Sequence, residues 1–305
     1  MEKGFLFAGQ GAQFVGMGKD LYENFEIAKK YFDSAETVVP NLKKVCFEGP
    51  EDELKLTKFT QPAIFTMSVI IDDILKNEKG LNPDAAAGFS LGEYAALVSA
   101  GCFDFETGLK LVAARGEAMT EAGEKNPGTM AAIIGLEDSV VENVCKEITD
   151  SGELVTPVNY NCEGQLVISG TVAGVNKAVE ILDEKGAKRA IVLNVSGAFH
   201  SPLMEPAVEK LAAALDNVEI KNPNVPVVMN ASAEFVADAE KIKELMLKQL
   251  TSPVFWKQSV KKMIENGISE FYELGPGRVL SGFMRNIDRS VSIKNFQKIA
   301  DFDKI

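Results

Sequence analysis

Short apolar runs and longer stretches of helical periodicity alternate along the first 125 residues. The runs Gly4–Ala8 and Ala85–Phe89 have the length and composition of buried strands. Apolar residues spaced as on one face of a helix follow each run, in residues 64–74 and again in 105–119. Because strands that alternate with helices build parallel sheets, this pattern predicts an α/β fold with a mostly parallel sheet.

Capping residues predict where these helices begin and end. Thr60 is expected to cap the first helix, with Pro62 in its first turn, and Gly101 is expected to end a helix over Glu93–Ala100. Asp104 is expected to cap the next helix. Arg115 shares the apolar stripe of that helix, so the spacing predicts a guanidinium on the face that points inward.

A different pattern begins near residue 128 and ends near residue 197. Its element order is βαββαβ, the order of ferredoxin-like units, over Thr129–Gly135, Ser139–Thr149, Val155–Asn161, Gln165–Ser169, Ala173–Glu184 and Arg189–Val195. We therefore expect residues 128–197 to form a small inserted subdomain, with residues 1–127 and 198–305 as the large domain. The chain is expected to return to the main sheet through Val225–Met229 and Ile268–Leu274.

Composition narrows the class of protein. Of the 305 residues, 46% are hydrophobic and 25% are charged, which is typical of a folded protein and argues against disorder. The net charge of −12 repels a phosphate backbone, so nucleic acid is not expected as a partner. The apolar stretch near the start is too short for a signal peptide, and no stretch is long enough to span a membrane, so we expect a cytoplasmic protein without a membrane partner.

Cysteine and histidine counts limit the chemistry. The four cysteines are widely spaced and form no Cys-x-x-Cys pair, so we expect buried, reduced thiols. His200 is the single histidine, which excludes a metal site built on several histidines and leaves one imidazole for any acid–base step. No metal is expected.

The segment Gly88-Phe89-Ser90-Leu91-Gly92 matches the G-x-S-x-G nucleophile elbow, in which a serine projects from a tight turn between a strand and a helix. An apolar strand and a helix flank this copy, as the elbow requires; the alternative is a serine that only caps a helix. A serine nucleophile needs a base, and His200 is the only imidazole. Taken alone, a single histidine is more often structural, and the elbow serine reverses this expectation because it needs a base.

The glycine-rich segment Gly9-Gln10-Gly11-Ala12-Gln13 follows the first strand. It has Phe14 where a dinucleotide-binding loop needs a third glycine, and it lacks the Gly-Lys-Ser/Thr of a P-loop. Its exposed amides could instead supply one oxyanion donor, with the amide of Leu91 as the other. The alternative is a flexible turn.

Charged residues leave two further questions open. A buried Arg115 needs an anionic partner, which is either an internal carboxylate or the carboxylate of a substrate. Lys257, Lys261 and Lys262 lie on a solvated helix face or form a patch that attracts an anionic partner.

Together these residues resemble the malonyl-CoA:acyl-carrier-protein transacylases, the acyltransferases that load bacterial fatty acid synthesis. The likeness runs nearly end to end. The matching segments are Phe7–Gln13, Thr60–Ala63, Gly88–Tyr94, Arg115-Gly116, Asn159–Asn161, Gly197–Ser201 and Glu273–Gly277.

The resemblance implies an α/β-hydrolase-like core with a ferredoxin-like insert. It implies that Ser90 is the nucleophile, that His200 is the base, and that the backbone carbonyl of Gln249 orients the histidine in place of an acidic triad member. It also implies that the amides of Gln10 and Leu91 bind the oxyanion.

Three further positions concern the substrate. The resemblance implies that Arg115 binds the malonyl carboxylate and that the ring of Phe199 leaves little room for a branched acyl group. The chain departs from the family at Phe89, where a histidine usually precedes the serine, and this puts substrate contacts near the elbow in question.

The expected reaction moves a malonyl group from coenzyme A to the phosphopantetheine thiol of acyl carrier protein, with no cofactor beyond the thioester substrate and with a monomeric enzyme. Three alternatives are open: a serine esterase or thioesterase on a related core, an acyltransferase that serves a polyketide pathway, and a carrier-binding subunit without catalysis.

Overall fold

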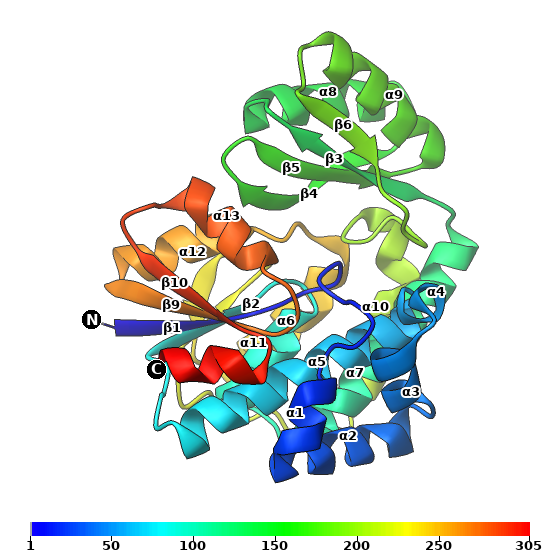
Figure 1. The fold of residues 1–305 in the computed structure, drawn as a ribbon. Helices are drawn as coiled ribbons and strands as arrows, with labels where there is room; N and C mark the ends of the chain where they lie inside the picture. Colours follow the sequence, from blue (N-terminus) through cyan, green and yellow to red (C-terminus); the bar gives the residue numbers. More distant parts are fainter. Residues whose placement is uncertain (1) are drawn as a thin grey trace.

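Two separate sheets organise the chain. The computed structural model describes residues 2–305, and Figure 1 shows a larger body with a smaller unit set above it. The larger sheet has the order β10-β9-β1-β2-β7-β8, and every neighbouring pair is parallel except β7 with β8. Its strands are β1 Glu2–Phe7, β2 Ala85–Gly88, β7 Val227–Met229, β8 Glu234–Val236, β9 Ile268–Leu274 and β10 Ser292–Phe296. The predicted α/β fold with a mostly parallel sheet is confirmed.

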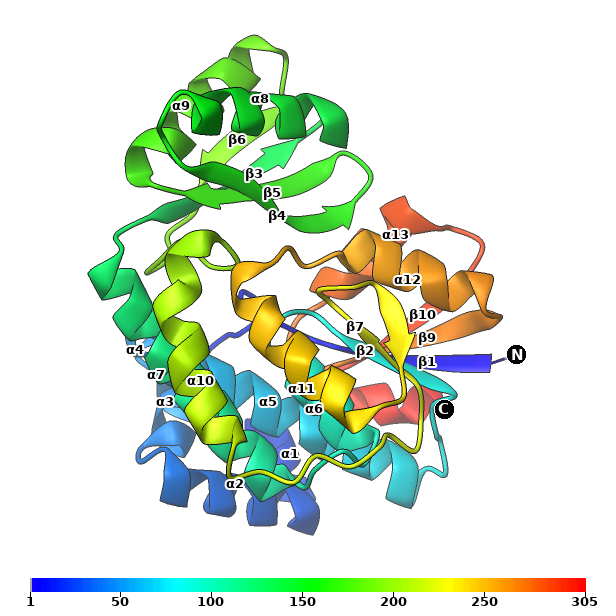
Figure 2. The ribbon, with the colours of Figure 1, turned by 180° about the vertical axis from the view of Figure 1, so that it is seen from behind.

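Helices cover both faces of this sheet. Phe5 and Phe7 of β1 pack into the larger apolar cluster, whereas Leu6 between them packs into a second cluster, as the alternation of side chains along a strand requires. The second cluster contains α12 and α13, and Figures 1 and 2 show these two helices on the face opposite the larger helical layer. The larger layer contains α1 Lys19–Asn24, α2 Glu26–Val38, α3 Leu42–Glu48, α4 Glu51–Leu54, α5 Thr57–Asp73, α6 Gly92–Ser99, α7 Phe105–Lys125, α10 Glu205–Leu215 and α11 Ala239–Lys248; α12 is Trp256–Glu265 and α13 is Val279–Ile287.

Short helical turns complete the larger body. The turn η1 continues α5, and η2 and η3 flank the helices α10 and α11. Their bounds are η1 Ile74–Glu78, η2 Pro202–Met204, η3 Gln249–Thr251 and η4 Ile299–Lys304. None of the helices in residues 2–305 combines the length and the apolar character needed to cross a bilayer.

The smaller unit is an antiparallel sheet of order β4-β5-β3-β6 with two helices on one face. Its elements are β3 Thr129–Ile134, α8 Asp138–Asp150, β4 Val155–Cys162, β5 Gln165–Gly170, α9 Val172–Glu184 and β6 Arg189–Val192. The predicted βαββαβ order is confirmed.

Contacts between β4 and the segment before α12 join the two bodies. The Tyr160 N–H donates to the Val254 carbonyl at 3.0 Å, and the Val254 N–H donates to the Val158 carbonyl at 2.7 Å. The buried Lys257 amine lies 2.6 Å from an Asp138 oxygen and 3.2 Å from a Glu163 oxygen. Lys261 and Lys262 pair with acids as well, Lys261 with Glu163 and Lys262 with Glu234. The lysines after Trp256 are therefore ion-paired, which argues against a patch free to attract an anion.

Two details of the predicted elements are wrong. The helix expected to begin at Thr60 begins at Thr57, because Leu56 supplies the first carbonyl acceptor, for the N–H groups of Phe59 and Thr60. The hydroxyl of Thr60 donates to the carbonyl of Leu54 instead of capping the helix. The edge strands β8 and β10 were not predicted; each is five residues or shorter, too short for a clear period.

Candidate active site

The turn from β2 into α6 places Ser90 in a strained backbone conformation. Its φ is +50°, a left-handed value that is uncommon for a residue other than glycine. The glycines on either side are required by close packing: a Cβ on Gly88 would collide with the backbone of Gly92, and one on Gly92 would collide with the Phe7 carbonyl of β1. The motif therefore folds as a tight elbow with the serine at its apex.

His200 lies on the segment between β6 and η2, also with a left-handed φ of +61°. Its Nε2 atom lies 2.8 Å from Ser90 Oγ, although 110 residues separate the two along the chain. Its Nδ1 atom lies 2.8 Å from the backbone carbonyl oxygen of Gln249, which can only accept, so Nδ1 carries the proton and Nε2 faces the serine hydroxyl as an acceptor. The structure thus brings together the predicted serine, histidine and glutamine carbonyl.

Burial and a neighbouring cation keep the imidazole neutral. Desolvation, followed by the positive charge of Arg115, lowers the pKa of His200 from 6.5 to about 4. At neutral pH the ring can therefore take a proton from the serine hydroxyl.

Arg115 is 1% exposed and points into the same site. Its Nη1 donates to Gln61 Oε1 at 2.9 Å, and its Nη2 donates to Ser90 Oγ at 3.0 Å and to Gln249 Oε1 at 2.9 Å. No carboxylate of residues 2–305 lies within 4.0 Å of the guanidinium, whose Nε has no hydrogen-bond partner. Of the two partners that the sequence left open, an internal acid in direct ion-pair contact is thus not present. The site has a buried cation directed at the nucleophile and able to bind an anionic group.

The loop after β1 packs against the elbow. A Cβ on Gly9 would collide with the carbonyl of Phe89, so the glycine permits this approach and brings Gln10 beside the turn. Neither the Gln10 N–H nor the Leu91 N–H donates to any acceptor in the described part of the chain. Two free amides on the two sides of a serine are what an oxyanion site needs.

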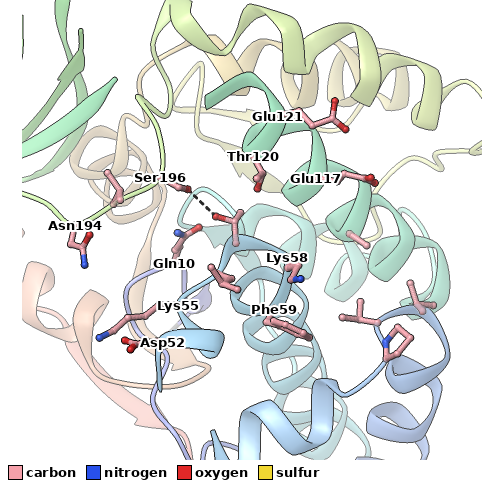
Figure 3. A pocket seen from close by; sticks show the side chains of 17 residues that line it. Gln10, Asp52, Lys55, Lys58, Phe59, Glu117, Thr120, Glu121, Asn194 and Ser196 are labelled. Atoms are coloured by element: carbon pink, nitrogen blue, oxygen red, sulfur yellow. Dashed lines mark hydrogen bonds between the residues drawn. The ribbon is translucent and has the colours of Figure 1, made fainter. Parts of the chain in front are cut away.

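A cavity of about 850 Å³ opens beside Gln10 (Figure 3). Its walls come from α5, α7, the loop after α2 and the segment 194–196 that leads to His200. Leu56 and Phe59 give it apolar surface, and Lys55 and Lys58 place amines at its border. The volume lies in the range of sites for small ligands. Phe199 is buried next to His200 but does not line this cavity, so its effect on specificity remains a prediction.

Phe89, the departure from the family pattern, packs away from the reacting groups. Its ring centroid lies 5.5 Å from that of Trp256 and 5.9 Å from that of Phe283, within the second apolar cluster. The residue before the serine therefore anchors α12 and α13 to the elbow.

Two polar residues beneath the elbow, Glu93 and Asn230, were not predicted from the sequence. Glu93 is fully buried in α6 and accepts from the Asn230 N–H at 2.6 Å and from Gln249 Nε2 at 2.9 Å. Burial raises the pKa of Glu93 to about 8, and those donors together with the charge of Arg115 oppose the shift. The signal available was a glutamate in a helix that is otherwise almost wholly apolar.

Metal chemistry has no evident site. Within residues 2–305, no group of three or more His, Cys, Asp or Glu side chains is placed to hold a metal ion.

Known proteins share both the sequence and the fold. A family model described as an acyl transferase domain matches residues 4–296. The chain is 48% identical over 286 residues to a malonyl CoA-acyl carrier protein transacylase of Bacillus subtilis, which covers 93% of this chain and 90% of the relative. It is 40% identical to the protein of that name from Staphylococcus aureus, over 97% of this chain and 96% of the relative.

Solved structures agree with this likeness. An acyl carrier protein S-malonyltransferase of Vibrio cholerae superposes with a TM-score of 0.95 at 39% identity, over 100% of this chain and 99% of that one. A malonyl-transacylase solved in complex with its type II PKS acyl-carrier protein superposes with a TM-score of 0.96, also at 39% identity, over 100% and 98% of the two chains.

Proposed function

The chain belongs to the acyl transferase family, and we propose that its Ser90 and His200 transfer a malonyl group from coenzyme A to acyl carrier protein. The enzyme is an acyltransferase of the malonyl CoA-acyl carrier protein transacylase type. It matches proteins of that name over nearly their whole length. A neighbouring structure that contains an acyl-carrier protein supports the carrier as the second substrate.

In the first step, Ser90 Oγ attacks the thioester carbonyl while His200 Nε2 takes the hydroxyl proton. The 2.8 Å separation between these atoms supports direct proton transfer. The oxyanion forms beside the amides of Gln10 and Leu91, and one such donor contributes about 3–4 kcal/mol to the stability of a transition state. His200 then gives the proton to the sulfur as coenzyme A leaves, and the malonyl group remains on Ser90 as an ester.

In the second step, the phosphopantetheine thiol of the carrier attacks that ester. His200 takes the thiol proton and returns it to Ser90 Oγ as the serine leaves. The product is a malonyl thioester on the carrier. No group outside the two substrates and the chain is needed for the balance.

The surroundings of Arg115 are the observation that favours malonyl as the acyl group. Arg115 is buried without a carboxylate within 4.0 Å among the described residues, and its Nη2 lies 3.0 Å from the nucleophile. A malonyl group on Ser90 carries a free carboxylate, which would supply the missing anion in a desolvated site. A simple esterase gains nothing from such a cation.

A transfer assay tests the proposal. Malonyl-CoA, methylmalonyl-CoA and acetyl-CoA are each supplied with the phosphopantetheinylated carrier of fatty acid synthesis or with a polyketide carrier. We expect efficient transfer from malonyl-CoA to the fatty acid carrier, with the methyl branch disfavoured by Phe199. Rapid release of free malonate without any thiol acceptor would identify a thioesterase instead. A preference for the polyketide carrier would place the enzyme in that pathway.

Binding of the carrier without any acyl transfer would identify a non-catalytic subunit.

A further inference from the structure

Glu93 has no part in the steps above, yet it is completely buried a short distance from the nucleophile. It lies in α6, three residues after Ser90 and within the helix that the elbow begins. A buried carboxylate is costly unless donors satisfy both of its oxygens. In Glu93 each oxygen has an N–H donor, Asn230 N for Oε2 and Gln249 Nε2 for Oε1. Both oxygens of Glu93 therefore act as acceptors, and these donors together with the charge of Arg115 oppose the rise in pKa that burial causes.

One of these donors, Gln249, also contacts the histidine and the arginine. The Gln249 side chain is itself fully buried, and its Oε1 accepts from Arg115 Nη2 at 2.9 Å. The backbone carbonyl of the same residue lies 2.8 Å from His200 Nδ1. Gln249 thus contacts Glu93, Arg115 and His200 together.

Glu93 fixes which way the Gln249 amide points. With the NH₂ group toward Glu93, the carbonyl oxygen faces the guanidinium, and every contact joins a donor to an acceptor. The reversed amide would place NH₂ against the guanidinium and oxygen against the carboxylate, so both contacts would be repulsive. A glutamine at position 93 carries an NH₂ group as well as an oxygen, so it could face either orientation of the Gln249 amide and would lose this discrimination.

The other donor, Asn230, binds the backbone of the elbow. Asn230 follows β7, and its Oδ1 accepts from the Ser90 N–H at 2.7 Å while its Nδ2 donates to the Gly88 carbonyl at 2.7 Å. The Gln249 amide also donates to the Ser90 carbonyl at 3.0 Å. The two residues that Glu93 holds therefore bind both ends of the strained Ser90 backbone.

We propose that Glu93 is a positioning residue of this reaction, which through Gln249 holds Arg115 and His200 in place against Ser90. The inference rests on the proposed function for its kinetic part only. Glu93 touches none of the reacting atoms. Its effect is to keep the base, the cation and the nucleophile in one fixed geometry, where displacement by about 1 Å costs about 100-fold in rate.

The test compares Glu93→Gln with Asp72→Asn. Asp72, near the end of α5, is also a buried carboxyl, but it pairs with Lys76 of η1 and with Ser99 at the far end of α6. It therefore controls for the loss of a buried acid as such. We expect Glu93→Gln to lower kcat for malonyl transfer about 10- to 100-fold and to lower the ratio of malonyl to acetyl transfer, because the arginine moves as well. Asp72→Asn is expected to change neither when the rates are normalised to folded protein.

A second readout needs no activity. His200 is the only histidine, so ¹⁵N-histidine NMR of tag-free protein reports this ring alone. Glu93→Gln is expected to shift the ring signals and Asp72→Asn to leave them in place. If wild-type protein transferred no malonyl group, the proposed function would fail while this arm still decided the role of Glu93.

The variant Gln249→Met keeps the backbone carbonyl and removes the side-chain amide, which covers the case in which Glu93→Gln does not fold. It is expected to reproduce the fall in the malonyl to acetyl ratio. Where both single variants fold, the double variant is expected to be no worse than the poorer of the two. The proposal is overturned if Gln249→Met leaves the ratio unchanged. Wild-type kcat and ring signals in folded Glu93→Gln, or losses in the two variants that simply multiply, would also overturn it.

Discussion

Replacing Arg115 by methionine separates recognition of the acyl group from catalysis. The methionine keeps most of the buried volume and removes the charge, together with the donors to Gln61, Gln249 and the serine hydroxyl. On the proposed mechanism, malonyl-CoA loses the partner of its carboxylate. Acetyl-CoA has no carboxylate and loses nothing comparable.

The magnitude follows from the contacts. Hydrogen bonds that involve a charged group contribute about 1.5–3 kcal/mol each, so loss of a two-pronged contact costs about 3–5 kcal/mol. At about 1.4 kcal/mol per factor of ten, kcat/KM for malonyl-CoA should fall roughly 100- to 4,000-fold. The free energy of unfolding should change by no more than about 2 kcal/mol, because two unpaired amide oxygens are offset by removal of a desolvated charge.

The assay measures kcat/KM for malonyl-CoA and acetyl-CoA with one carrier, alongside urea unfolding of the same preparation. The expected result is a selective loss toward malonyl-CoA in a folded protein. Equal losses toward both donors would refute carboxylate recognition, and so would a variant that fails to fold, because the arginine would then be structural.

Three further results are expected. In an NMR titration, His200 should stay neutral down to about pH 4. Because the ring of the unfolded chain takes its proton near pH 6.5, the free energy of unfolding should fall by about 3 kcal/mol as the pH is lowered from 6.5 to 4. An ordinary pKa for this ring in the folded protein would contradict the prediction. Gly92→Ala should cost at least about 3 kcal/mol in thermal unfolding because its Cβ meets the Phe7 carbonyl, and a stable variant would show that the elbow can relax. Lys257→Met should lower the free energy of unfolding in urea by about 1–3 kcal/mol, since Asp138 loses its partner and Glu163 keeps only Lys261; unchanged stability would make these pairs inconsequential.

Local patterns were enough to predict the elbow and the inward arginine. The two glycines around Ser90 are dictated by contacts within the turn and with the adjacent strand, so the motif has its signature in five consecutive residues. Arg115 was found because a helix turns about 100° per residue, which fixes the face on which a side chain lies. His200 was found because no other imidazole exists, and nothing in its own neighbourhood places it near residue 90.

The supporting residues could not be found in this way. Glu93 stands in the first turn of a helix, where an exposed acid is favoured by the helix dipole, and its burial becomes visible only when the surrounding elements cover α6. Asn230 follows a three-residue strand, where the sequence indicates an ordinary turn. Thr60 was also predicted wrongly for this reason. Its hydroxyl was expected to cap the helix, but in the folded chain it donates to the carbonyl of Leu54.

Intact mass spectrometry after mixing the enzyme with malonyl-CoA, without any carrier, tests the covalent step most directly. We expect one added malonyl group, mapped to Ser90 by peptide analysis. It should disappear when the phosphopantetheinylated carrier is added, and it should not form on the Ser90→Ala variant. An unmodified enzyme that transfers malonyl groups at the full rate, or an adduct on any other residue, would contradict it.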